Sequence, residues 1–125
     1  DKAIADFTKA IEIDPQDGDA YYERGYAWTD KGDYGKAIAD FTKAIEIDPQ
    51  DGDAYYERGY AWGKKGDYDK AIADFTRAIE IDPQDGDAYY ERGYAWKLKG
   101  DNEKADADYK KAIELKPELR DLPKY

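Results

Sequence analysis

The sequence repeats itself with a period of 34 residues, and no other feature constrains its fold as strongly. Residues 18–51 and 52–85 differ at only four of these 34 positions. A period of this length is typical of a solenoid, in which one unit cannot bury its own apolar face and stacks on its neighbours. We therefore expect the second helix of an incomplete repeat, three complete repeats and a short tail, at residues 1–17, 18–51, 52–85, 86–119 and 120–125.

Each unit contains two helical stretches, expected at residues 19–31 and 35–47 in the first complete copy, with Gly and Pro at the joints. Asp33 and Asp51 precede helices, where a short carboxylate accepts from free backbone amides. In the second stretch, spacings of three and four put the apolar residues on one face: Ala37, Ile38, Phe41, Ala44, Ile45 and Ile47. The sequence therefore predicts an all-α chain of seven helices.

The spacing of aromatic and small residues resembles the tetratricopeptide repeat family over residues 1–119. That pattern places an aromatic, a small residue and an aromatic on the first helix, then Ala, an aromatic, Ala and Pro on the second. In the first complete copy, the matching residues are Tyr21, Gly25, Trp28, Ala37, Phe41, Ala44 and Pro49. The resemblance implies a right-handed α-α superhelix of helix-turn-helix repeats, whose first helices line a concave groove.

One departure from the family pattern is an arginine where a leucine usually precedes the glycine, at Arg24, Arg58 and Arg92. An unpaired charge between helices costs several kcal/mol, so each arginine needs a partner. An aspartate follows each arginine at the same offset in the second helix, at Asp40, Asp74 and Asp108. We predict pairs of the Arg24–Asp40 type, and we favour this structural role over an anion-binding row of arginines.

The first helices carry more aromatic residues than a core needs, and the surplus tyrosines predict a binding groove. Tyr22 and Tyr26 are four residues apart and therefore share one helical face. The alternative is that these tyrosines pack on one another and stiffen the solenoid. The copies also vary at the ends of these helices, where the paired positions are Thr29-Asp30, Gly63-Lys64 and Lys97-Leu98. The candidate peptide-binding residues are Asp19, Tyr22, Tyr26, Asp30, Asp53, Tyr56, Tyr60, Lys64, Asp87, Tyr90, Tyr94 and Lys97.

The charge of the chain limits the partners that such a groove accepts. The formal net charge is −10 at pH 7, which disfavours nucleic acid and anionic membrane surfaces. Some members of the family hold a carboxylate with Lys and Asn, but this groove offers Tyr, Glu23 and Asp19 instead, and these acidic side chains repel an anion. We expect a protein or peptide partner with basic and aromatic or proline side chains. The predicted function is a protein-protein interaction scaffold.

Composition argues against catalysis and against metal or cofactor binding. The chain has no His and no Cys, and it also lacks Ser, so the usual nucleophiles and general bases are missing. The segment Asp14–Asp19 superficially resembles a calcium loop, but Pro15 and Arg24 fall where ligands should be. We expect a non-enzymatic protein without a cofactor or metal. The absence of a long apolar run predicts a soluble protein without membrane insertion, and we favour a cytoplasmic location.

The two ends of the array differ, which suggests a second function as a self-assembling homo-oligomer. Near-identical repeats could stack between chains as they do within one. At the N-terminal end, the apolar residues Ala3, Phe7 and Ala10 lack a preceding first helix, so we expect another chain or further upstream repeats to cover them. At the other end, Asp106 and Lys116 give the final helix a polar outer face, as a terminal cap requires. Leu119 and Leu122 are expected to fold back over it.

Overall fold

The computed structural model describes residues 1–124 and consists of seven α-helices and one 3-10 helix. The helices are α1 (Lys2–Ile13), α2 (Gly18–Asp30), α3 (Tyr34–Ile47), α4 (Gly52–Lys64), α5 (Tyr68–Ile81), α6 (Gly86–Lys99), α7 (Asn102–Leu115) and η1 (Pro117–Asp121). They confirm the prediction of seven helices without strands across the described part of the chain. In the first complete copy, each observed helix lies within one residue of its predicted bounds.

An aspartate immediately precedes every α-helix and caps its N-terminal end, as the sequence predicts. The carboxylate of Asp33 accepts a hydrogen bond from the backbone amide of Lys36, and Asp51 accepts one from Ala54. The joints between the two helices of each repeat contain Gly32, Gly66 and Gly100, with φ values of 80°, 87° and 100°. Only glycine adopts this left-handed conformation without strain, so these three residues fix where each first helix ends.

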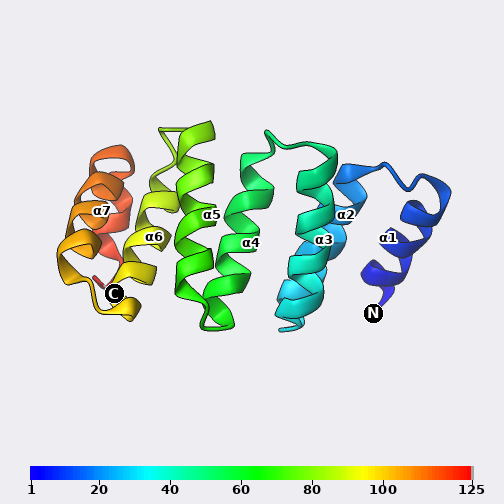
Figure 1. The fold of residues 1–125 in the computed structure, drawn as a ribbon, viewed down its shortest axis with the longest axis horizontal. Helices are drawn as coiled ribbons and strands as arrows, with labels where there is room; N and C mark the ends of the chain where they lie inside the picture. The colour runs from blue at the N-terminus through cyan, green and yellow to red at the C-terminus, as the bar shows by residue number, and fades with distance from the viewer. Residues whose placement is uncertain (125) are drawn as a thin grey trace.

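The helices form an extended row in which each packs against the next, with α1 at one end and α7 at the other (Figure 1). The first helices of the complete repeats, α2, α4 and α6, also contact one another in order. They therefore form a continuous inner layer, while α1, α3, α5 and α7 are the second helices of their repeats. None of the helices within residues 1–124 is long and apolar enough to cross a membrane.

The core of each repeat lies where the aromatic residue of the second helix meets the glycine of the first. Phe41 is fully buried, and a Cβ atom added at Gly25 would lie only 2.8 Å from its ring. The same contact would be 3.0 Å between Gly59 and Phe75. Because any side chain here would push the two helices apart, glycine is required at these positions for close packing.

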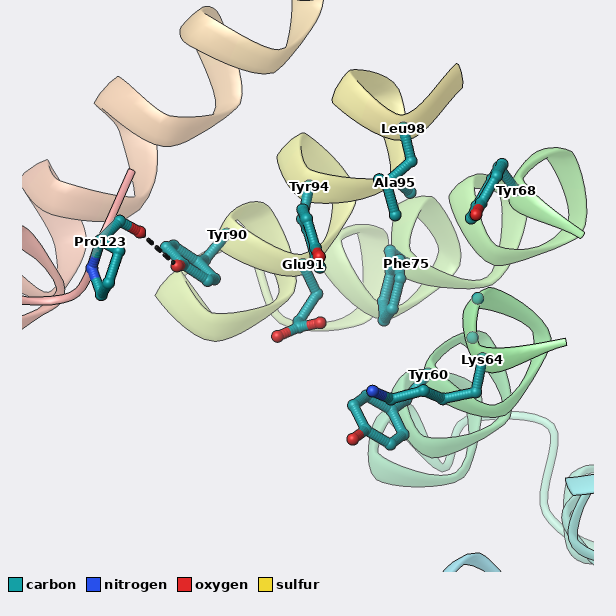
Figure 2. A pocket seen from close by; sticks show the side chains of 12 residues that line it. Tyr60, Lys64, Tyr68, Phe75, Tyr90, Glu91, Tyr94, Ala95, Leu98 and Pro123 are labelled. Atoms are coloured by element: carbon teal, nitrogen blue, oxygen red, sulfur yellow. Dashed lines mark hydrogen bonds between the residues drawn. The ribbon is translucent and has the colours of Figure 1, made fainter. Parts of the chain in front are cut away.

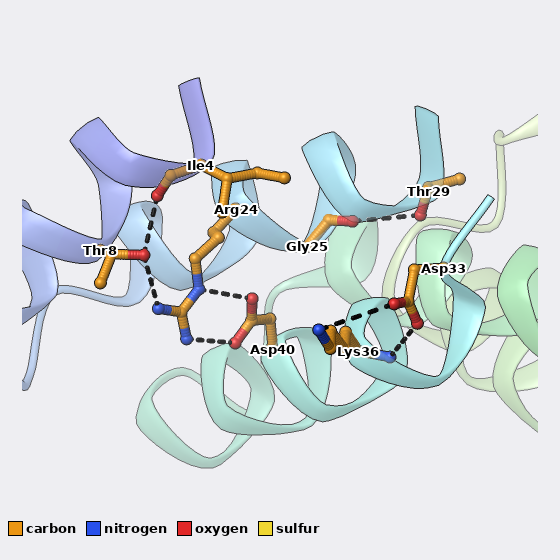
Figure 3. Close-up of polar contacts among 8 residues, drawn as sticks. All are labelled: Ile4, Thr8, Arg24, Gly25, Thr29, Asp33, Lys36 and Asp40. Carbon is orange, nitrogen blue, oxygen red and sulfur yellow. Dashed lines mark hydrogen bonds and ion pairs between the residues drawn. The ribbon is translucent and has the colours of Figure 1, made fainter. Parts of the chain in front are cut away.

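The predicted arginine–aspartate pairs are confirmed in all three complete repeats. Arg24 donates from Nε and Nη2 to the two carboxylate oxygens of Asp40, at 2.7 and 2.8 Å (Figure 3). Arg58 pairs in the same way with Asp74, and Arg92 with Asp108. Each aspartate is buried, so a two-bond pair supplies the partner that a buried charge requires.

Each of these arginines also reaches the second helix of the preceding repeat, which the sequence analysis missed. Arg24 Nη1 donates to the hydroxyl of Thr8 at 3.1 Å, and that hydroxyl donates onward to the Ile4 carbonyl at 2.7 Å (Figure 3). The signal was present in the sequence, because a threonine lies 16 residues before each arginine. One guanidinium therefore connects three helices and links successive repeats.

The C-terminal end only partly follows the expectation of a folded-back tail. Leu119, in η1, is buried as expected. The expectation for Leu122 is wrong, because this residue is exposed. Its backbone is extended and continues away from η1 to Pro123, whose carbonyl accepts a hydrogen bond from the Tyr90 hydroxyl at 3.0 Å. Asp106, on the exposed face of α7, pairs with Lys124 at 2.9 Å.

Candidate peptide-binding groove

The candidate tyrosines of the inner helices fall into two groups by their exposure. Tyr26 and Tyr94 are 45% and 41% exposed. Tyr22, Tyr56, Tyr60 and Tyr90 are half-buried, and the ring centroids of Tyr22 and Tyr56 lie 5.7 Å and 5.6 Å from those of Phe41 and Phe75. The rings of this second group therefore pack against the second helices rather than standing free on the groove surface.

Burial changes the chemistry of the half-buried tyrosines. Desolvation raises the pKa of the Tyr22 hydroxyl, and the nearby carboxylates of Glu57 and Asp53 raise it further. The same causes raise the pKa of Tyr56, with Glu91 and Asp87 as its main acidic neighbours. Both hydroxyls therefore stay protonated near neutral pH and add no negative charge to the inner layer.

A cavity of about 500 Å³ between α4 and α6 brings together four of the predicted groove residues: Tyr60, Lys64, Tyr90 and Tyr94 (Figure 2). Apolar side chains from the core and from α6 complete its walls, among them Phe75 and Leu98. The ammonium of Lys64 lies 5.4 Å from the centroid of the Tyr60 ring. This volume lies within the range of roughly 300–1,000 Å³ that ligand pockets typically occupy.

A second cavity, of about 480 Å³, is strongly acidic and brings together Asp53, Tyr56 and Asp87. Glu57, Asp82 and Asp85 add three further carboxylates to its lining. Its only basic lining residue is Lys116, which donates to both carboxylate oxygens of Asp87 at 3.0 Å. The acidic character of the groove is therefore concentrated between α4 and the start of α6.

Two glutamates of this surface, Glu57 and Glu91, were missing from the candidate residues. Burial, with Asp53, Glu91 and Asp30 nearby, raises the pKa of Glu57 to about 7. Burial also raises the pKa of Glu91, an effect that the neighbouring Lys64 partly offsets. They occupy the same position in successive repeats, one residue after Tyr56 and Tyr90, and this spacing could have identified them.

The remaining candidate residues lie outside the two cavities. Asp19, Tyr26 and Asp30 are exposed on α2, and Tyr22 is half-buried on the same helix. Lys97 is exposed near the end of α6. The cavities therefore involve α4 and α6 but none of the four candidate residues of α2.

The predicted self-association residues occupy the outermost helix, α1 (Figure 1). Ala3 is exposed, and Phe7 and Ala10 are half-buried. Their counterparts in α3 are fully or almost fully buried. Because the two helices have the same sequence from Lys2 and Lys36 onward, this contrast arises from position in the row alone.

Stacked helical pairs with a continuous inner layer define the class of this protein as a helical-repeat interaction scaffold. A profile described as "Tetratricopeptide repeat" matches residues 52–85 and 86–119, and related profiles match residues 25–66 and 7–39. The chain belongs to the tetratricopeptide repeat family, whose members are generally interaction modules rather than enzymes. The comparison with curated proteins gives no significant match.

Several solved structures share this fold. A crystal structure of MamA is 30% identical over 96% of this chain, with a TM-score of 0.86, and this chain spans 66% of its length. The Arabidopsis OM64 TPR domain is 28% identical, covering 81% of this chain and 84% of that domain, with a TM-score of 0.80. The first TPR of Spaghetti (RPAP3), bound to the HSP90 peptide SRMEEVD, is 28% identical, covers 86% and 91% of the two chains, and has a TM-score of 0.79.

Proposed function

We propose that this protein binds a peptide segment with basic and aromatic or proline side chains along its acidic, tyrosine-lined inner face. The observation that carries the proposal is the pair of neighbouring cavities on α4 and α6, one with tyrosine walls and one with several carboxylates. Tyrosine rings offer large contact areas at a low entropic cost, and carboxylates attract cationic side chains.

The acidic surface also separates this chain from a similar structure with a known ligand. The peptide bound to the RPAP3 domain, SRMEEVD, is acidic towards its end. In this chain, Glu57, Glu91 and Asp53 line the surface that an acidic peptide of this kind would contact. Like charges at close range disfavour such binding. We therefore assign a basic partner to this groove and no catalytic role.

Charge along the array gives the bound peptide a direction. The net charge is −4 over residues 18–51 and −1 over 86–119. A peptide with one basic end would place that end towards the N-terminal repeats. Exchanging Asp30 and Lys64 should weaken or reverse this preference, as a spin label at one end of the peptide would report. An unchanged orientation and affinity would show that these two positions are passive.

Calorimetric titration of two peptide sets of equal length and aromatic content tests the main proposal. We expect the Lys/Arg-rich set to bind and its affinity to fall as salt rises, because the attraction is screened. Glu57→Lys should weaken this binding, whereas Glu23→Lys, at the equivalent exposed position of α2, should have a smaller effect. Tighter binding of the Asp/Glu-rich set would refute the proposal.

A second candidate function is assembly of copies through α1, favoured by the exposed apolar face around Phe7. Because Phe7 is already half-buried, covering this face would recover about half of the roughly 1.5–3 kcal/mol that full burial of such a ring contributes. Light scattering over a concentration series should show association in the native chain and less in a Phe7→Asp variant. A native chain that stays monomeric throughout the series would exclude this candidate.

A further inference from the structure

The cavity between α4 and α6 contains a glycine that neither packing nor backbone conformation requires. A Cβ atom added at Gly63 would meet only Ala71 Cβ, at an ordinary distance of 3.9 Å. Gly63 is also outside the group of glycines with positive φ. A glycine in the middle of a helix costs about 0.5–1 kcal/mol relative to alanine, and Gly63, in the last turn of α4, has a cost of at most this size. The cost is not offset by a structural need, so the space beside Gly63 is a candidate functional feature.

The preceding repeat provides a matched comparison for this position. There the equivalent residue is Thr29, whose hydroxyl donates to the Gly25 carbonyl at 3.1 Å (Figure 3). Residues 18–51 and 52–85 are otherwise nearly identical, so a threonine is compatible with the surrounding fold. The absence of this side chain at Gly63 leaves open space beside Tyr60 and Tyr68.

The walls of this cavity suit an apolar ring next to a cation. Tyr60, Tyr94 and Leu98 provide apolar contact area, and Leu98 is 47% exposed at the rim. The equivalent rim position on α4 is the charged Lys64, so this apolar rim is a property of α6. Glu91 and Lys64 also line the cavity (Figure 2), and the carboxylate of Glu91 offers a partner for a positive charge.

The C-terminal segment Leu122–Lys124 places a proline ring at the edge of the cavity. Pro123 is one of the lining residues, and its carbonyl accepts from the Tyr90 hydroxyl at 3.0 Å (Figure 2). The ammonium of Lys124 pairs with Asp106 at 2.9 Å and lies 5.6 Å from the ring centroid of Tyr109. The tail therefore places a proline at the rim, while the lysine that follows it is held outside the cavity by a carboxylate and a ring of α7.

We propose that the cavity beside Gly63 is the specificity site of the groove and receives a proline–lysine segment of a partner peptide. Pro123, in the chain's own Leu122–Lys124 segment, occupies the rim of this cavity, so the segment competes with that peptide. This inference rests on the proposed function and narrows its ligand from basic peptides in general to those with proline before lysine. A bound peptide would displace Pro123 from the rim and take over the Tyr90 hydrogen bond.

A titration of the full chain with an acetylated, amidated Leu-Pro-Lys peptide, followed by two-dimensional NMR, tests this site. We expect shift changes at Tyr60, Glu91 and Leu98. Gly63→Thr should weaken binding about tenfold, because it fills the pocket. The variant places in α4 the residue that α2 already accommodates, and a thermal melt checks that the fold is kept. Thr29→Gly is the matched control and should leave binding at the α4–α6 cavity unchanged.

Changes to the tail test the competition. A Pro123→Gly and Lys124→Glu double variant should bind the free peptide several-fold more tightly, because the competing segment is weakened. Weaker binding by this variant would show that the tail belongs to the site and would overturn the competition.

The outcomes also distinguish the two proposals. Unchanged affinity in Gly63→Thr, with basic peptides still shifting groove residues, would overturn the specificity site and leave the proposed function intact. Equal binding of Leu-Gly-Lys and Leu-Pro-Lys would have the same meaning. If no basic peptide shifts any residue of α4 or α6, the proposed function itself is wrong.

Discussion

Helices α1 and α3 have identical sequences over Lys2–Ile13 and Lys36–Ile47, yet they have different surroundings. Phe41 of α3 is fully buried between α2 and α4, whereas Phe7 of α1 is half-buried at the end of the row. Asp40 is buried and paired with Arg24, whereas Asp6 is exposed beside Lys2. The comparison teaches that a repeat protein assigns different roles to identical residues through their neighbours alone.

The largest expected difference concerns the two phenylalanines. Phe41→Ala should destabilise the protein by about 3–5 kcal/mol, because it removes a fully buried ring and leaves a cavity. Phe7→Ala removes the same atoms from a half-buried site and should cost about 1 kcal/mol. Urea unfolding at a low protein concentration gives both values. Equal losses would mean that α1 is covered as completely as α3, contrary to the structure.

The next largest difference concerns the two aspartates. Asp40→Ala leaves the guanidinium of Arg24 without its carboxylate in the seam between helices and should cost about 3 kcal/mol. Asp6→Ala removes only an exposed contact with Lys2 and should change stability by less than about 0.5 kcal/mol. Thermal denaturation of both variants measures the contrast. An unchanged midpoint for Asp40→Ala would argue that the pair contributes nothing to the seam.

The smallest expected difference compares Glu57 of α4 with its counterpart Glu23 of α2. Burial and neighbouring carboxylates raise the folded-state pKa of Glu57 to about 7, above the ordinary glutamate value of about 4.3. Its protonated form is therefore favoured by folding, and the stability that it contributes below about pH 4 is lost as the pH rises through about 7. Glu57→Gln should remove this dependence and stabilise the protein at pH 8 by on the order of 1 kcal/mol after solvent screening.

Urea unfolding at pH 5 and pH 8 measures this effect. Glu23→Gln is the matched control, because Glu23 is exposed, and it should change the difference between the two pH values little. The pKa of Glu57 also predicts that a lysine-containing peptide binds more tightly as the pH rises through 7, since the ionised carboxylate is the attractive form. A pH-independent affinity would remove Glu57 from the binding surface.

Much of the fold could be predicted from local sequence, while the groove could be predicted only in part. Gly25 and Phe41 recur together, and their close approach explains why. The arginine–aspartate pairs followed from charge and a fixed offset, whereas the bond from Arg24 to Thr8 in the preceding repeat was missed although it has the same offset of 16 residues. Tyr22 was predicted on the groove surface, and its partial burial against Phe41 depends on the packing of α2 on α3.

The sequence by itself determined the period, the helices, their caps and the pairing of buried charges, because each depends on residues within about one repeat of each other. Only the tertiary structure decided how far each residue of α1 is buried, where the cavity beside Gly63 opens, and that Pro123 reaches Tyr90. These features depend on contacts between successive repeats and on which neighbour is present. A repeating sequence contains no local signal for position in the row, so burial and pKa differ between residues whose sequence surroundings are the same.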